Sequence, residues 1–209
     1  MEDVLDLYAE PYDVWQPVVC FDETSKQLIA ETRPALPTCP GQVERVDYEY
    51  ERNGTRNLFM MVEPLAGWRH IEVTQQRTKV DFAHVMRYLA DCVYPKATCI
   101  RVVLDNLNTH CPAALYEAFP PEEARRLLKR LDFHYTPKHG SWLNMAELEL
   151  GIFARQCLDR YMPDEAFLKH EVKALEDERN GALAKLRWRF TAADARTKLK
   201  RLYPLNLDG

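Results

Sequence analysis

Three acidic residues stand where an apolar run ends or a helical pattern begins. Asp22 closes the run PVVCFD, Asp105 follows CIRVVL, and Glu147 comes early in the helical segment SWLNMAELELGIF. Carboxylates that converge repel one another, and burial raises their pKa values. Divalent cations remove that repulsion, and two such ions stabilise the attacking and leaving oxygens of a phosphodiester displacement. The pattern therefore predicts phosphodiester cleavage or transfer, with Asp22, Asp105 and Glu147 as catalytic metal ligands.

Each acid taken alone also has an ordinary structural explanation. The pair Asp105-Asn106 after a strand is a common turn, and Asp22 could open another turn. Glu147 could be an exposed helical acid, since Glu149 lies close by on the same helix. The metal-site interpretation depends on all three acids falling on suitable elements together.

The hydrophobic pattern predicts the elements that would position these acids. Strand patterns occur at 17–22, 56–63, 68–75, 99–104 and 131–136. Turns are predicted at Asn53-Gly54 and at Pro64–Gly67. Helical spacing follows Thr78, a plausible N-cap, and recurs at 112–130 (split at Pro120-Pro121), 143–161, 164–186 and 191–201, with one short helix at the start of the chain.

This order of elements predicts an α/β fold with a mixed five-stranded sheet, three antiparallel strands and then two parallel ones, flanked by helices. It resembles the order of the RNase H-like fold. Residues 1–163 would form the catalytic domain, and 164–209 a helical C-terminal extension packed on that domain or following it. The first and fourth strands would be neighbours, so Asp22 and Asp105 can face each other. The helix after the fifth strand would bring Glu147 over them.

Composition limits the classes of protein that the chain could be. Its 209 residues, 46% hydrophobic and 29% charged, suit a globular domain. The acidic start, interrupted by Pro11, is unlike a signal peptide, and no apolar run approaches the roughly 18 residues that cross a bilayer. Six scattered cysteines predict reduced thiols in a cytoplasm. The net charge is -4, yet residues 185–201 carry seven basic residues against one Asp, which suits either nucleic acid or a solvated face.

Four segments together resemble the DDE transposases of bacterial insertion sequences in the mariner superfamily. They are CFDETSKQLIAE (20–31), VLDNLNTH (103–110), YTPKHGSWLNMAELEL (135–150) and WRFTAADARTKLKRLYP (188–204), in the family's order. The resemblance implies a catalytic DDE endonuclease domain whose three acids are Asp22, Asp105 and Glu147. Many members have Asn-Pro before the third acid, whereas this chain has Asn144-Met145. Glu149 therefore stays an alternative third acid.

The resemblance also implies an activity and its partners. The enzyme would cut DNA at element ends with two Mg²⁺ (or Mn²⁺) ions, freeing a 3′-hydroxyl that then attacks target DNA. Its partners would be the terminal inverted repeats, target DNA and a second copy or more of the chain, at the nucleoid in a bacterial cytoplasm and away from membranes. Such transposases carry N-terminal helix-turn-helix modules, which we expect to be absent here. The chain would then be a truncated product, or one half of an element encoded in two parts.

Several further residues are candidates for DNA contact, and some alternatives stay open. Lys138, His139 and Trp142 precede the acidic helix. His110 could touch DNA or water near the metals, or be a buried, hydrogen-bonded histidine. Rival functions are another RNase H-like nuclease, such as a ribonuclease or resolvase, and an inactive domesticated or truncated DNA-binding domain. The basic tail contributes the remaining candidates: Arg187, Arg189, Lys198, Lys200 and Arg201.

Overall fold

A single mixed β-sheet forms the centre of the molecule. The computed structural model describes residues 1–32 and 49–203. The strands lie in the order β3-β2-β1-β4-β5, with β1, β2 and β3 antiparallel and β4 and β5 parallel to β1. This is the RNase H-like arrangement predicted from the order of elements, which is confirmed. The strands are β1 (Val18–Glu31), β2 (Tyr50–Glu63), β3 (Trp68–Thr74), β4 (Ile100–Leu104) and β5 (Leu131–Tyr135).

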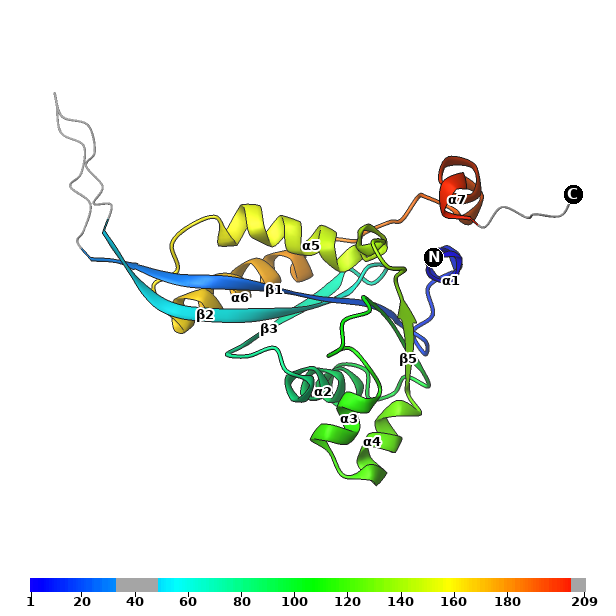
Figure 1. The fold of residues 1–209 in the computed structure, drawn as a ribbon, viewed down its shortest axis with the longest axis horizontal. Helices are drawn as coiled ribbons and strands as arrows, with labels where there is room; N and C mark the ends of the chain where they lie inside the picture. Colours follow the sequence, from blue (N-terminus) through cyan, green and yellow to red (C-terminus); the bar gives the residue numbers. More distant parts are fainter. Residues whose placement is uncertain (33–48, 204–209) are drawn as a thin grey trace, which may run out of the picture.

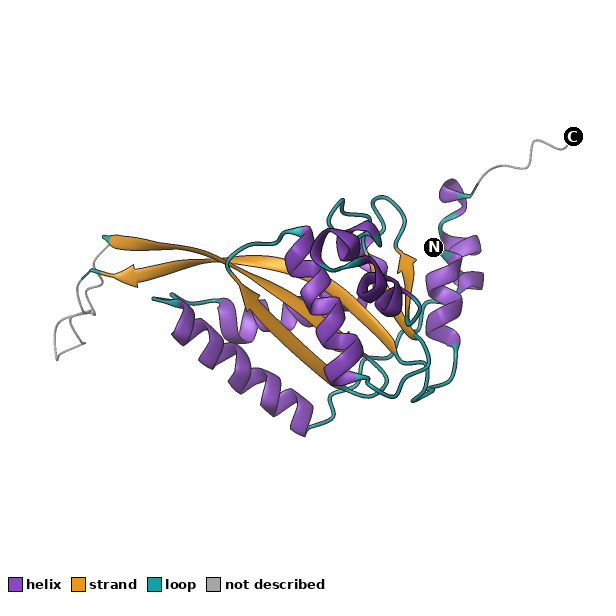
Figure 2. Cartoon of the chain, turned by 90° about the horizontal axis from the view of Figure 1, so that it is seen from below, coloured by secondary structure: helices purple, strands orange, loops and turns teal. Residues whose placement is uncertain are grey.

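Helices cover both faces of the sheet (Figures 1 and 2). One face carries α5 (Met145–Phe153) and α6 (Glu165–Gly181), and the opposite face carries α2 (Lys79–Tyr88), α3 (Ala113–Ala118) and α4 (Pro121–Leu128). A third group, α1 (Glu2–Ala9) and α7 (Ala192–Lys198), packs together beyond β5. Short π-helical turns extend α2 to Val93 and α5 to Leu158, and 3₁₀ turns occupy Ser141–Leu143 and Lys200–Leu202.

Alternation along β1 divides its side chains between two hydrophobic cores. Phe21 packs with Phe82 on the α2 side, whereas Cys20 packs with Phe153 on the α5 side. Because successive side chains of a strand point to opposite faces, Asp22 follows Cys20 to the α5 side and Glu23 follows Phe21 to the α2 side. Two neighbouring acids in the sequence therefore serve different layers of the fold.

Local signals explain where the helices begin. Thr78 caps α2 with a capping box, since its side chain accepts a hydrogen bond from the backbone N–H of Asp81 and the Asp81 carboxylate accepts one from the backbone N–H of Thr78. Pro121 stands in the first turn of α4, where its missing N–H costs nothing. The predicted cap at Thr78, the split at Pro120-Pro121 and the turn at 64–67 are all confirmed.

Two expectations about the first strands were wrong. The first strand runs on to Glu31, well past the predicted end at Asp22. Asn53-Gly54 forms no turn: it lies inside β2, where the pairing register shifts between Gln27 and Ile29. Gly54 has a φ of 86°, which fits a β-bulge with glycine in the left-handed region. The Pro-rich stretch at 33–48 lies outside the described residues.

The last three helices are shorter than predicted, and α7 covers only Ala192–Lys198. The helix after β5 starts at Met145 and passes into a π-helical turn at Ala154, and α6 ends at Gly181. Leu168 and Val172 of α6 join the same core as α5. Throughout 1–32 and 49–203 no helix is long and apolar enough to cross a membrane. Five cysteines in these ranges are free thiols, and Cys39 lies outside them.

Candidate active site

Parallel pairing of β1 with β4 places the first two acids at the same edge of the sheet. Cys20 of β1 pairs with Val103 of β4. Asp22 and Asp105 each lie two residues farther along in the same direction, so the two acids come side by side. Asp105 directly follows the end of β4. Glu147 lies in the first turn of α5, which packs against β1. The three acids therefore reach one region from a strand, a strand end and a helix.

Asn144 ties the start of α5 to β1. Its side chain is fully buried and caps the helix, accepting a hydrogen bond from the backbone N–H of Ala146 at 3.1 Å. Its amide Nδ2 donates to the backbone carbonyl of Phe21 at 2.7 Å and lies 3.4 Å from Asp22 Oδ2. One side chain thus fixes the position of Glu147 relative to Asp22.

Asp22 is a half-buried carboxylate without a cationic neighbour. Burial raises its pKa to about 7, the backbone N–H of Glu23 opposes this by donating to Oδ1 at 2.8 Å, and the negative charges of Glu23, Asp105 and Glu147 add to the increase. Among the residues that the structure describes, no Lys, Arg or His forms an ion pair with Asp22 or Glu147. The carboxylate therefore lacks a positive charge that would favour its ionised form.

Asp105, by contrast, is paired. His110 Nδ1 lies 2.6 Å from Asp105 Oδ1, and the backbone N–H of Leu107 donates to the same oxygen at 3.2 Å. Burial raises the pKa of Asp105, but the hydrogen bond and charge of His110, together with the backbone N–H of Leu107, outweigh that effect and leave the pKa below its ordinary value. The other ring nitrogen, Nε2, lies 3.0 Å from Glu23 Oε2, a close ion pair without hydrogen-bond alignment. His110 is thus the buried, hydrogen-bonded histidine that was one of its two interpretations.

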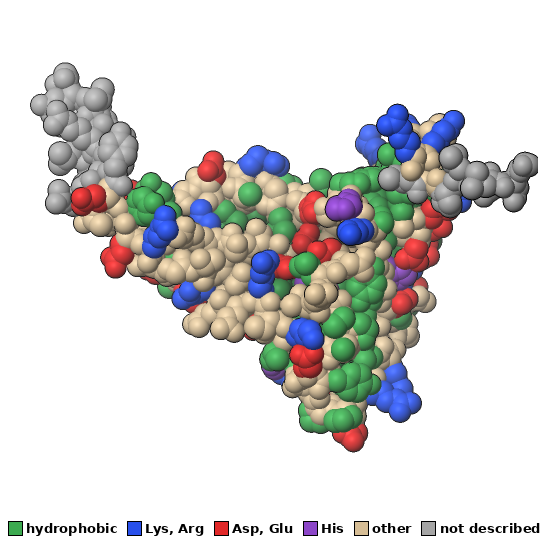
Figure 3. Space-filling view, viewed as in Figure 1, with side chains coloured by type: hydrophobic (Ala, Val, Ile, Leu, Met, Phe, Trp, Pro, Cys, Tyr) green, Lys and Arg blue, Asp and Glu red, His purple; other side chains and the backbone are tan. Residues whose placement is uncertain are grey.

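The donor set suits a divalent cation. Hard cations prefer carboxylate oxygens, and no basic side chain among the described residues forms an ion pair with Asp22. Within the described ranges, no three carboxylate, imidazole or thiolate groups already converge into a metal-binding set. Figure 3 shows acidic side chains gathered beside α5. A groove of about 540 Å³ opens there between β1 and α5, lined by Asp22 and Glu147 and continued by Lys26 and Asp159.

Glu149, the alternative third acid, has a different environment. It is fully buried on α5 and accepts hydrogen bonds from Arg179 at 2.6 and 2.9 Å, while Arg69 Nε lies 2.8 Å from Oε1. Arg69 is itself fully buried on β3, and Arg179 lies on α6. Because two arginines already occupy its oxygens, Glu149 connects three elements, and the geometry favours Glu147 as the acid available to a metal.

Comparison with known proteins identifies the family. Residues 17–169 match the family model described as DDE superfamily endonuclease. The chain belongs to this family. The DDE endonuclease domain is similar to two solved structures: the Mos1 mariner paired end complex with Mn (TM-score 0.55, 14% identity, 86% of this chain and 54% of that one) and the Mos1 Strand Transfer Complex (TM-score 0.54, 14% identity, 86% and 52%). It spans about half the length of those chains. No curated protein sequence matches it.

The predicted DNA-contact residues separate into two groups that meet at one aromatic cluster. Lys138 and His139 are exposed in the loop after β5. The Trp142 ring stacks on Trp188 with centroids 6.1 Å apart and meets Phe190 edge-on at 5.6 Å. These contacts attach the basic tail to the loop that leads into α5. The tail residues Arg187, Arg189, Lys198, Lys200 and Arg201 are all exposed.

Two residues of the site were not predicted from the sequence. The predicted first strand ends at Asp22 and so leaves Glu23 outside it, although the continuing strand buries the Glu23 side chain beside His110. Asn144 was noted only as a family motif position. A signal for Asn144 did exist, because Asn directly before a helical run is a preferred N-cap. No comparable signal pointed to Glu23, since its role depends on the length of β1.

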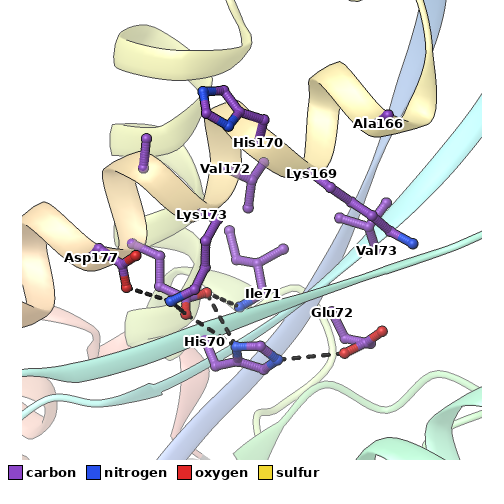
Figure 4. Close-up of a pocket in the computed structure, with 12 residues that line it drawn as sticks. His70, Ile71, Glu72, Val73, Ala166, Lys169, His170, Val172, Lys173 and Asp177 are labelled. Atoms are coloured by element: carbon purple, nitrogen blue, oxygen red, sulfur yellow. Dashed lines mark hydrogen bonds and ion pairs between the residues drawn. The ribbon is translucent and has the colours of Figure 1, made fainter.

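A second hollow, of about 620 Å³, lies between β3 and α6, and none of the three candidate metal ligands lines it (Figure 4). Several of its polar groups are already paired with one another. The buried Glu176 accepts a hydrogen bond from the backbone N–H of Ile71 at 3.0 Å and lies 3.1 Å from His70 Nδ1. Lys173 pairs with Asp177. These contacts join the edge strand to the helix, which is a structural role.

Proposed function

We propose that this DDE endonuclease domain is the catalytic domain of a DNA transposase, cutting DNA at the ends of an insertion sequence and joining the freed ends to target DNA. One observation carries the proposal: Asp22, Asp105 and Glu147 reach one edge of the sheet from three elements, and Asp22 has no cationic partner among the described residues. The similar structures are complexes of the Mos1 mariner element, one of them with Mn. That likeness supports DNA as the substrate.

Asp22, Asp105 and Glu147 would hold two Mg²⁺ (or Mn²⁺) ions. When bound, such ions activate the attacking oxygen and stabilise the leaving oxygen of a phosphodiester. The chain supplies the geometry. Asn144 holds the first turn of α5 against β1, and the groove between β1 and α5 offers space for the scissile strand beside the carboxylates.

The aromatic cluster and the basic tail would guide DNA toward the carboxylates. Trp142 is 41% exposed although it packs on two other rings, so one face of the indole can stack on a base. Arg187 and Arg189 form no ion pair among the described residues, which leaves them available to phosphates. Terminal inverted repeats and target DNA are the proposed partners. A homodimer or larger assembly would bring two element ends together.

Nicking of a duplex that carries an element end would test the proposal. The wild-type domain should nick it in Mg²⁺ but not in chelator. Asp22→Asn and Glu147→Gln should each reduce the rate more than about 100-fold, because even outer residues of a metal site cost 10- to 100-fold when changed. Glu122→Gln, an exposed acid on α4, is the matched control. Preference for an RNA–DNA hybrid would instead indicate a ribonuclease, and no cutting of any substrate would indicate an inactive domain.

A further inference from the structure

His110 lies in a buried position between two carboxylates that belong to different layers of the fold. Its side chain is 1% exposed and that of Glu23 is 2% exposed, whereas Asp105 is 29% exposed. The ring meets Phe21 edge-on and Phe82 at an oblique angle, each with centroids 5.1 Å apart. These contacts leave the imidazole little freedom to rotate or to tilt.

The two carboxylate oxygens of Asp105 differ in their hydrogen bonds. Oδ1 accepts from both His110 Nδ1 and the backbone N–H of Leu107. The other oxygen, Oδ2, takes part in no hydrogen bond or ion pair with a described residue. An oxygen that already accepts two hydrogen bonds has little capacity left for a cation, so Oδ2 is the oxygen of Asp105 that remains available as a ligand.

Glu23 holds the far side of the ring from β1, the strand that also carries Asp22. Oε2 of Glu23 lies 3.0 Å from His110 Nε2, and Oε1 faces Arg77 at 3.7 Å. The backbone carbonyl of His110 accepts a hydrogen bond from the Tyr135 hydroxyl of β5 at 2.9 Å. The loop after β4 is therefore tied to β1 and to β5, on both sides of β4.

We propose that His110, anchored by Glu23, is a positioning residue that orients Asp105 to bind a divalent cation through one oxygen. The inference rests on the proposed function, since it assigns a role toward the same metal site. In metal centres, residues that hydrogen-bond to a ligand orient it, and their loss costs about 10- to 100-fold in metal affinity. His110 acts here on a carboxylate ligand.

Two substitutions at His110 separate its two contacts. In His110→Asn the side-chain amide can take the place of Nδ1 and still donate to Asp105, whereas in His110→Gln it takes the place of Nε2 and faces Glu23. Mn²⁺ would be titrated against each variant without DNA, with the increase in unfolding midpoint as the measure of binding. The Mg²⁺ concentration that gives half-maximal nicking would be measured in parallel.

Two metal midpoints are compared: the Mn²⁺ concentration that gives half of the stabilisation, and the Mg²⁺ concentration that gives half-maximal nicking. We expect His110→Gln to raise both concentrations about tenfold or more, and His110→Asn to raise them clearly less. Glu23→Gln should also raise them, although it leaves Asp105 and the ring in place. His84→Gln, at an exposed histidine on α2, is the matched control and should change neither midpoint. A loss that came only from poorer folding would lower the maximal signal and leave the midpoints unchanged, which would overturn the proposal.

Metal midpoints equal to those of the wild type in His110→Gln would also overturn the positioning role of His110. In that case, metal-dependent nicking by the wild type that is lost in Asp22→Asn would still leave the proposed function intact. If the wild type showed neither nicking nor metal-dependent stabilisation, both proposals would fall.

Discussion

The carboxyl group of Asp22 is half-buried, with three further acids nearby and, among the described residues, no basic side chain paired with it. Its folded-state pKa of about 7, against an ordinary 3.8, means that the folded chain holds this proton more tightly than the unfolded chain does. Ionisation of Asp22 therefore lowers stability as pH rises from about 4 to 7. Above that range the destabilisation is complete, unless a cation binds.

Asp22→Asn should accordingly stabilise the metal-free domain while removing nicking. The gain in unfolding midpoint should be small at pH 4, grow up to pH 7 and then level off, because only the ionised carboxylate is destabilising. Thermal melts in chelator across this range, wild type against variant, measure the difference. A gain that stayed constant with pH would show that the charge of Asp22 is not its cause.

At the scale of elements, α5 holds two acids with opposite surroundings. Glu147 is exposed toward the groove, and Glu149 is fully buried between Arg69 and Arg179. The first depends on α5 being placed correctly, and the second helps to place it by linking the helix to β3 and α6. Both would look alike in a list of acids on one helix.

Glu149→Gln should therefore destabilise the fold, and Glu147→Gln should not. Removing one partner from a buried ion pair costs about 3–5 kcal/mol, since the remaining charge stays buried. Urea unfolding of the two variants, identical in chemistry and two residues apart, would measure this. Equal midpoints would contradict the account of Glu149.

The contact between β3 and α6 should weaken in alkali. Burial lowers the pKa of His70, but its contacts with Glu176 and Glu72 outweigh that effect and raise the pKa to about 9. The pair thus contributes fully below pH 6.5, the ordinary value, and its contribution is lost as pH rises through 9. The difference in unfolding free energy between wild type and His70→Gln should shrink from pH 6 to pH 10. A difference that did not change would show that the pair does not stabilise the protein.

Sequence patterns predicted which elements exist better than where they end. The order of strands, the cap at Thr78 and the acids at one edge followed from periodicity and strand order. Asn53-Gly54 misled because the dipeptide suits a two-residue turn and a bulge equally well. Only the pairing of its flanking residues, Arg52 with Ile29 and Thr55 with Gln27, separates the two. Long-range partners such as Glu23 depend on register, which no local pattern encodes.

On the scale of the whole molecule, charge is distributed unevenly. The chain is acidic overall, yet its basic tail is attached through Trp188 and Phe190 to the loop before α5. DNA bound along this tail would therefore meet positive charge near the start of α5, the helix that carries Glu147. Contacts of this kind reach phosphates and carry no sequence information directly.

DNA binding by this chain should be weak, dependent on salt and almost indifferent to sequence. Log affinity should fall against log salt with a slope of about -0.9 per phosphate neutralised. Arg187→Ala combined with Arg189→Ala should make the slope shallower. An element end should be favoured over random duplex by less than about tenfold, or roughly 1.4 kcal/mol. Titrations of both duplexes at two salt concentrations would check this, and a larger preference would mean that the domain reads bases itself.

The hydrogen bonds of Asn144 bear on how such a domain can change through evolution. Since this side chain ties the start of α5 directly to β1, the stretch between His110 and β5 can vary in length without moving the first and third acids. That stretch contains α3 and α4, which pack on the opposite face of the sheet. Insertions or deletions there can alter the outer shape of the protein, and the surfaces offered to other chains, while the carboxylates keep their places.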